Sequence, residues 1–171
     1  MNHTLMNQGV PGATAQMTDT VTIQLRNTIA PYEVMYSYRT LLLTNGYATV
    51  NVPSFGTYFL VVKQRNGLET WSKNPVSPGI FSTSYNFTTS QDKAFGDNQV
   101  ELQPGIWGVF AGDLYPDGNI DLLDLLAMDD AITNFNSDYL IADINGDGNV
   151  DLLDTPLIQE NIRNFVYSVH P

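Results

Sequence analysis

The chain contains 171 residues, no cysteine and a formal net charge of −11. This length allows one ordinary domain or two small ones, and the absence of cysteine excludes disulfides, zinc–thiolate centres and thiol catalysis. The charge is unevenly placed: residues 1–110 carry six acidic and six basic side chains, whereas residues 111–171 carry twelve acidic side chains and one basic one. With so few basic side chains to neutralise phosphates, a nucleic-acid-binding role is disfavoured.

The N-terminal segment MNHTLMNQGV lacks the basic and apolar regions of a signal peptide, and no apolar run is long enough to span a bilayer. Membrane insertion is therefore not expected. A secreted protein can also lack a signal-peptide pattern when the sequence is part of a longer chain. Residues 1–16 are polar and rich in small side chains, so we expect a tail or the end of a linker there.

From residue 18 onward the sequence takes the period-2 pattern of half-buried strands. Val21, Ile23 and Leu25 alternate with polar side chains, and Asn-Gly dipeptides at 45–46 and 66–67 mark hairpin turns. The expected strands are residues 18–26, 32–40, 47–52, 58–65, 68–72, 82–88 and 100–110. Several short strands with no helical stretch predict a β-sandwich domain over residues 17–111.

Two acidic loops follow, DLYPDGNIDLLD at residues 113–124 and DINGDGNVDLLD at residues 143–154. Each has Asp at positions 1, 5, 9 and 12 and Gly at position 6. Calcium takes six to eight oxygen ligands from such a loop, with side chains at positions 1, 3 and 5, a carbonyl at 7, a water held by 9 and a carboxylate at 12. Two loops in register predict two calcium sites rather than ordinary acidic turns.

Each loop leads into a stretch with helical periodicity, which we expect to start near loop position 9. The predicted core face is Leu125, Met128, Ile132 and Phe135 in the first copy and Ile158, Ile162 and Phe165 in the second. The unit is loop–helix with Asp at position 12, whereas an EF-hand is helix–loop–helix and usually has Glu there. A very short link of Ala111 and Gly112 predicts that the two modules are in contact.

These loops and the segments LQPGIWGVFAGDL, TNGYATVNVP and YFLVVKQRNGLETWS carry a resemblance to a known family. Residues 112–171 resemble a type I dockerin-like, EF-hand-like repeat pair. Residues 10–112 resemble the immunoglobulin-like β-sandwich that precedes such repeats near the C-terminus of large secreted bacterial proteins. The resemblance implies two modules, an all-β sandwich followed by an all-α dockerin-like pair at residues 112–171. It also implies an extracellular or cell-surface location.

The same resemblance assigns calcium ligands to the loop positions of this chain. They are Asp113, Tyr115, Asp117, Asn119, Asp121 and Asp124 in the first loop, and Asp143, Asn145, Asp147, Asn149, Asp151 and Asp154 in the second. Asn119 and Asn149 would supply their main-chain carbonyls. Tyr115 departs from the family, which has Asn or Asp at position 3, because a neutral phenol is a poor and overlong calcium ligand. We therefore expect the first site to bind calcium more weakly.

Dockerins attach to protein partners such as cohesins through loop positions 10 and 11 and nearby helix positions. Those positions hold Leu122, Leu123, Leu126, Leu152 and Leu153 here, whereas cellulosomal dockerins usually carry small polar side chains. A cohesin-like or other secreted protein is thus a possible partner, although not obviously a cellulosomal cohesin. The alternative is that these leucines are partly buried against the sandwich or the opposite loop.

The function favoured by the sequence is a non-catalytic, calcium-binding anchoring or structural segment of a secreted protein. Both histidines, His3 and His170, lie in terminal segments, so an enzyme is not expected. The alternative is a carbohydrate-binding module appended to a polysaccharide-degrading enzyme, with Trp71 or Tyr58 as a stacking platform. We favour Trp71 in the core, with Lys63 and Arg65 on a solvated face.

Overall fold

The computed structural model describes residues 4–7, 9–134 and 141–171. The N-terminal part contains a short helix, six strands and two 3₁₀ turns. They are α1 (Thr4–Asn7), β1 (Met17–Arg26), β2 (Val34–Leu43), β3 (Phe59–Gln64), β4 (Thr70–Trp71), η1 (Gln91–Lys93), η2 (Phe95–Asp97), β5 (Val100–Gln103) and β6 (Ile106–Gly108). Two helices follow, α2 (Leu122–Thr133) and α3 (Thr155–Arg163). No helix of the described residues is long and apolar enough to cross a membrane.

Strands β1 to β4 form an antiparallel sheet in the order β2-β1-β3-β4, and β5 and β6 form a separate hairpin. The predicted alternation in β1 is confirmed, since Val21, Ile23 and Leu25 are buried while their neighbours are more exposed. The turn at Asn66 and Gly67 joins β3 to β4, as the Asn-Gly signal predicts. This turn points toward the helical end of the molecule.

Two expected strands do not form. Residues 47–52 make one isolated bridge, between Ala48 and Leu42, and residues 82–88 lie outside any strand. The expected strand at 100–110 is instead the β5–β6 hairpin, which turns at Pro104 and Gly105, where Gly105 has a φ of 75°. A period-2 pattern shows that a segment suits a sheet surface, but a strand also needs a continuous ladder of pairing, and residues 47–52 make a single bridge to the edge strand β2.

The predicted fold class, an all-β immunoglobulin-like sandwich followed by an all-α dockerin-like pair, is wrong. The strand-built N-terminal part fits the all-β half of that expectation, but the C-terminal part is not all-α. Its helices have 12 and 9 residues, and each is preceded by a loop without regular structure. The chain after α3 is extended, and Tyr167 bridges to Asn119 of the first loop.

Helix α3 also starts later than its counterpart. Helix α2 begins at loop position 10, whereas α3 begins at Thr155, one residue beyond position 12. Pro156 explains the difference, because proline has no N–H to donate to Leu152, as a longer helix would require. Proline is tolerated in the first turn, where it lies here.

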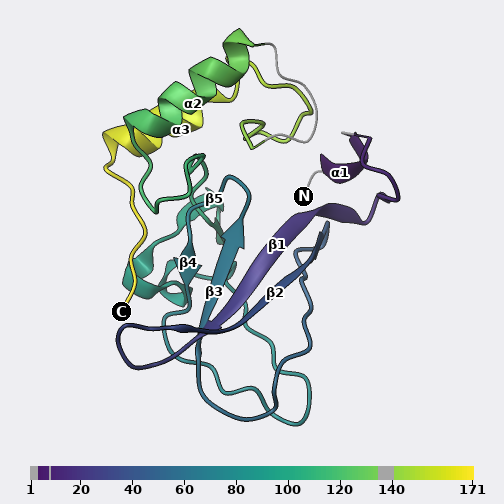
Figure 1. Cartoon of the computed structure of the whole chain (residues 1–171), viewed down its shortest axis with the longest axis vertical. Coiled ribbons are helices and arrows are strands. Elements are labelled where there is room, and N and C mark those ends of the chain that lie inside the picture. Colours follow the sequence, from purple (N-terminus) through teal and green to yellow (C-terminus); the bar gives the residue numbers. More distant parts are fainter. Residues whose placement is uncertain (1–3, 8, 135–140) are drawn as a thin grey trace.

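The two parts of the chain share a hydrophobic core. Leu68, which follows the β3–β4 turn, packs with Leu114, Ile120, Met128 and Ile158. Figure 1 shows α2 and α3 side by side beyond one end of the sheet, with the C-terminal segment returning along the sheet's flank. The expectation from the short link, that the two modules are in contact, is therefore met in the structure.

Part of the predicted helical core face is confirmed. Met128 and Ile158 are fully buried, and Leu125, Ile132 and Ile162 pack around them. Phe165 was predicted to be core but is 84% exposed. The reason is local: α3 ends at Arg163, and Phe165 has a φ of 51°, so its side chain leaves the helical face. Phe135 lies outside the described residues.

Candidate metal centres

The carboxylate at loop position 12 closes each loop through the same three hydrogen bonds. In the first loop, Asp124 Oδ1 accepts from the N–H groups of Leu114 (2.8 Å) and Tyr115 (2.9 Å), and Oδ2 accepts from Asp121 (2.8 Å). In the second loop, Asp154 accepts from Ile144 (2.8 Å), Asn145 (2.9 Å) and Asp151 (3.1 Å). Identical contacts 30 positions apart show that the sequence repeat is also a structural repeat.

The carboxylates at positions 1 and 12 are buried in both loops, since Asp113, Asp124, Asp143 and Asp154 are each at most 4% exposed. Burial, together with the nearby charge of Asp124, raises the pKa of Asp113 to about 6. Burial also raises the pKa of Asp143, although the Gly146 N–H and Arg65 partly oppose it. Buried carboxylates that crowd one another favour a bound cation.

The donor chemistry of both loops suits a hard divalent cation. Asp113 Oδ1 is buried and has no hydrogen-bond partner among the described residues, so it is free to take a ligand. All side chains in the expected ligand set offer oxygen, the donor that calcium prefers. Within the described residues, no three acidic or histidine side chains form a metal cluster by themselves. Calcium would therefore be held by the buried carboxylates together with amide and main-chain oxygens and water.

The middle positions of the loops are more open than the ends. Asp117 and Asp147 at position 5 are exposed, and each accepts a 2.8 Å hydrogen bond from the main-chain N–H at position 7. Asp121 and Asp151 at position 9 accept from the N–H two residues later, at 2.8 and 2.7 Å. Asn119 and Asn149 are exposed, with side chains that donate to the position-5 carboxylates.

The loops differ at position 3. In the second loop, Asn145 Oδ1 accepts a 2.8 Å hydrogen bond from the N–H of Asp147, so this amide oxygen turns into the loop. In the first loop, the main-chain carbonyl of Tyr115 accepts from Asp117, and the phenol is 64% exposed. The Tyr115 side chain is therefore exposed to solvent, whereas the Asn145 amide oxygen faces its loop.

The five leucines expected to contact a partner lie on the surface. Leu122 is 70% exposed and Leu152 is 73% exposed, and Leu123, Leu126 and Leu153 are also exposed. The structure adds Leu157, another exposed leucine in the second copy, which sequence analysis did not single out. The five side chains keep between 54% and 73% of their surface exposed, so the larger part of each faces solvent rather than the sheet or the opposite loop.

Arg65 and Asn66, at the β3–β4 turn, contact the second loop and were missed as site residues. Arg65 was expected on a solvated face, but its side chain is 13% exposed and paired with Asp19. Its guanidinium and the Asn66 amide both donate to the main-chain carbonyl of Asp143. The signal in the sequence is weak, because Asp19 lies far away along the chain.

The two aromatic side chains considered as glycan platforms are buried. Trp71 is 2% exposed and packs edge-on against Tyr32 and Phe59, while its indole N–H donates to Glu69. Tyr58 is 9% exposed. Neither ring can stack on a sugar, so the carbohydrate-binding alternative loses the residues on which it was based. His170 also contacts Trp71, with ring centroids 5.7 Å apart.

The part of the chain that contains the loops and helices is similar to a known domain family. Residues 111–163 match the family model described as Dockerin type I domain. The match covers both loops and both helices, and none of the β-sheet. Dockerin type I domains are non-catalytic modules that bind calcium. The match does not extend to residues 1–110, so it does not bear on the expected immunoglobulin-like character of the β-part.

Among solved structures, the chain is similar to two interface mutants of a type II Cohesin-X-Dockerin complex from Acetivibrio cellulolyticus. One match has 20% identity, a TM-score of 0.46 and coverage of 83% of this chain and 80% of the other. The second has 19% identity, a TM-score of 0.48 and coverage of 86% and 82%. TM-scores below 0.5 do not establish a shared fold. A search of curated proteins gave no match.

Proposed function

We propose that this chain is a calcium-dependent attachment segment of a larger secreted protein, in which the dockerin-type part binds another protein. The carrying observation is that the region matched to the dockerin family folds into two loops closed by identical contacts. Attachment needs no catalytic residues, and the proposal assigns none. We place the module boundary near Ala111 and Gly112, with residues 1–16 as a tail or linker.

Each loop holds one calcium ion in this proposal. The first site uses Asp113, Asp117, Asp121 and Asp124 with the carbonyl of Asn119, and the second uses Asp143, Asn145, Asp147, Asp151 and Asp154 with the carbonyl of Asn149. Two calcium ions would offset four charges in a region that carries twelve acidic side chains and one basic one. The buried, unpartnered Oδ1 of Asp113 supports the first site.

The second site is the tighter one in this proposal. Asn145 presents an amide oxygen inside the second loop, whereas Tyr115 presents none in the first. A missing side-chain ligand must be replaced by water or a main-chain oxygen, and calcium affinity follows the number, charge and rigidity of the ligands.

The partner-binding surface consists of Leu122, Leu123, Leu126, Leu152 and Leu153. Leu122 and Leu123 occupy the same places as Leu152 and Leu153 in the other copy, whereas the counterpart of Leu126 is Pro156. All five leucines are exposed, although the helices bury other apolar side chains in their shared core. Clustered exposed leucines are costly in water unless a partner covers them. A protein partner with an apolar contact surface fits them better than one that reads small polar side chains.

The test is capture of a protein from the native secretome with the intact chain as bait. The proposal predicts a bound protein in calcium that is released by chelator. Its matched control is the chain with Leu122→Ser and Leu152→Ser, which keeps both calcium loops. Capture that ignores both the chelator and the leucine changes would contradict the attachment role.

A further inference from the structure

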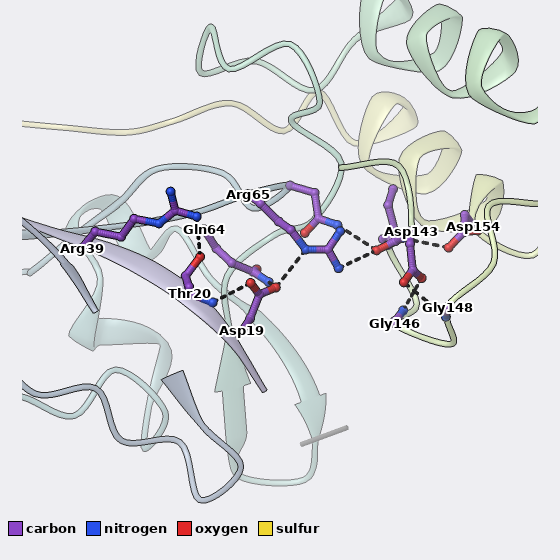
Figure 2. A network of polar contacts seen from close by, with 11 residues as sticks. Asp19, Thr20, Arg39, Gln64, Arg65, Asp143, Gly146, Gly148 and Asp154 are labelled. Atoms are coloured by element: carbon purple, nitrogen blue, oxygen red, sulfur yellow. Dashed lines mark hydrogen bonds and ion pairs between the residues drawn. The ribbon is translucent and has the colours of Figure 1, made fainter. Parts of the chain in front are cut away.

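The turn between β3 and β4 reaches out of the sheet and contacts the first residue of the second loop. Arg65 Nη2 donates to the main-chain carbonyl of Asp143 at 3.1 Å, and Asn66 Nδ2 donates to the same oxygen at 3.0 Å. Figure 2 shows Arg65 between Asp19 of β1 and Asp143 of the loop. The sheet therefore fixes the backbone at position 1 of this loop from outside the repeat.

The hydrogen bonds from Arg65 and Asn66 to the Asp143 carbonyl also restrict the Asp143 side chain. Its carboxylate accepts hydrogen bonds from the N–H groups of Gly146 (2.8 Å) and Gly148 (3.2 Å), which curl the loop around it. The side chain of Asp143 is fully buried. With the main-chain carbonyl held on one side and the carboxylate on the other, Asp143 has little freedom to leave its ligand position.

The charge of Arg65 is partly offset within the sheet, although it still acts on the Asp143 carboxylate. Arg65 Nε lies 2.9 Å from Asp19 Oδ2, and the two side chains are 13% and 2% exposed. Gln64 Nε2 also donates to Asp19 Oδ2, at 3.3 Å. Asp19 thus orients the guanidinium and offsets part of its charge, and the guanidinium donates its hydrogen bond to the Asp143 carbonyl.

The first loop is held less directly. The N–H of Gly112 donates to the main-chain carbonyl of Asn66 at 2.7 Å, which fixes the residue before position 1. Within the described residues, no side chain of the sheet donates to Asp113 in the recorded hydrogen bonds. The β3–β4 turn therefore contacts the second loop through the side chains of Arg65 and Asn66, and the first through a main-chain carbonyl. Both side chains lie outside the region that matches the dockerin family.

We propose that Arg65 and Asn66 are positioning residues of the second calcium site, oriented by Asp19, and that the β-part thereby raises the affinity of that site alone. The inference rests on the proposed function, in which the second loop binds calcium. Outer-shell partners that orient a ligand contribute roughly 10- to 100-fold to metal affinity. Loss of this hold is expected to weaken the second site about tenfold, at the low end of that range, because the loop keeps all its own ligands.

The test uses the full chain and isolates each site by removing its exposed position-5 carboxylate. Asp117→Ala silences the first site and Asp147→Ala silences the second, and the two residues have matching contacts within their loops. Two changes at the turn are then compared in both backgrounds. Asp19→Asn with Arg65→Gln removes the ion pair without leaving a buried charge, and Asn66→Ala removes one donor while keeping that pair.

The matched control is Lys73→Gln with Asp97→Asn, which also removes one acid and one base from the β-part but lies at an exposed pair. Calorimetric titration with calcium should show about tenfold weaker binding for the turn variants in the Asp117→Ala background, and no change in the Asp147→Ala background. Equal weakening in both backgrounds, or none in either, would overturn the inference. An Asp117→Ala parent that fails to bind calcium would instead overturn the proposed second site itself.

Discussion

Changing Leu122 and Leu152 together to serine tests whether these leucines bind a partner or stabilise the core of the fold. Both side chains lie at loop position 10 of their repeats and are 70% and 73% exposed. About three tenths of each leucine is therefore removed from water in the isolated chain. If these residues serve a partner, the change should lower binding and leave folding nearly intact.

The expected loss of stability follows from the buried area. Full burial of a leucine side chain is worth about 1.5–3 kcal/mol, so burying three tenths of two leucines is worth roughly 1–2 kcal/mol in total. In a chain of this length, 1 kcal/mol shifts the melting temperature by about 2–4 °C. The control is Met128→Ala with Ile158→Ala, two fully buried side chains for which each substitution should cost about 2–5 kcal/mol.

The assay pairs thermal melting in saturating calcium with capture of the secretome partner. The account predicts a small shift in melting and a large loss of capture for the serine variant. The alanine control should show a large shift in melting. A serine variant that melts as early as the alanine control would show that the leucines belong to the core, and the proposed interface would be wrong.

Three further predictions concern the loops, the sheet and the junction. Tyr115→Asn should strengthen the weaker of two calcium-binding steps in calorimetry, because it supplies the missing position-3 oxygen; unchanged binding would refute the ranking of the sites. Burial works to raise the pKa of Glu69, but Lys63 and Arg26 outweigh it and hold that pKa below its usual range. Its contribution to stability should be present above the ordinary glutamate pKa and lost as pH falls through the lowered one; melting against pH should show this loss for the native chain and not for Glu69→Gln. NMR relaxation should report one rotational correlation time for the sheet and the helices, since Leu68 joins their core; two separate times would contradict the shared packing.

Local patterns predicted the loops well because the information is contained within twelve residues. The spacing of Asp and Gly predicted two equivalent loops, and the structure closes both with the same contacts from position 12. Leu122 and Leu152 stand at a loop position through which dockerins contact a partner, and both side chains are exposed.

The features that were missed depend on partners far away in the chain. The sequence predicts Arg65 on the surface, because its partner Asp19 lies 46 positions earlier in the chain and the fold alone brings the two together. Residues 47–52 alternate like a strand but make a single bridge, between Ala48 and Leu42 of the edge strand β2. The prediction that Phe165 lies in the core was wrong for a local reason. Phe165 follows the end of α3 and has a positive φ, which moves its side chain off the helical face.

The central claim, that calcium organises the loops and helices, is tested most directly by circular dichroism of the intact chain during calcium titration and after chelation. The account predicts that the helical signal of α2 and α3 and its melting temperature fall when calcium is removed and recover when it is restored, because binding to the folded state alone stabilises it. The signal of the β-sheet should change little. An unchanged helical signal with unchanged melting in chelator would contradict the account.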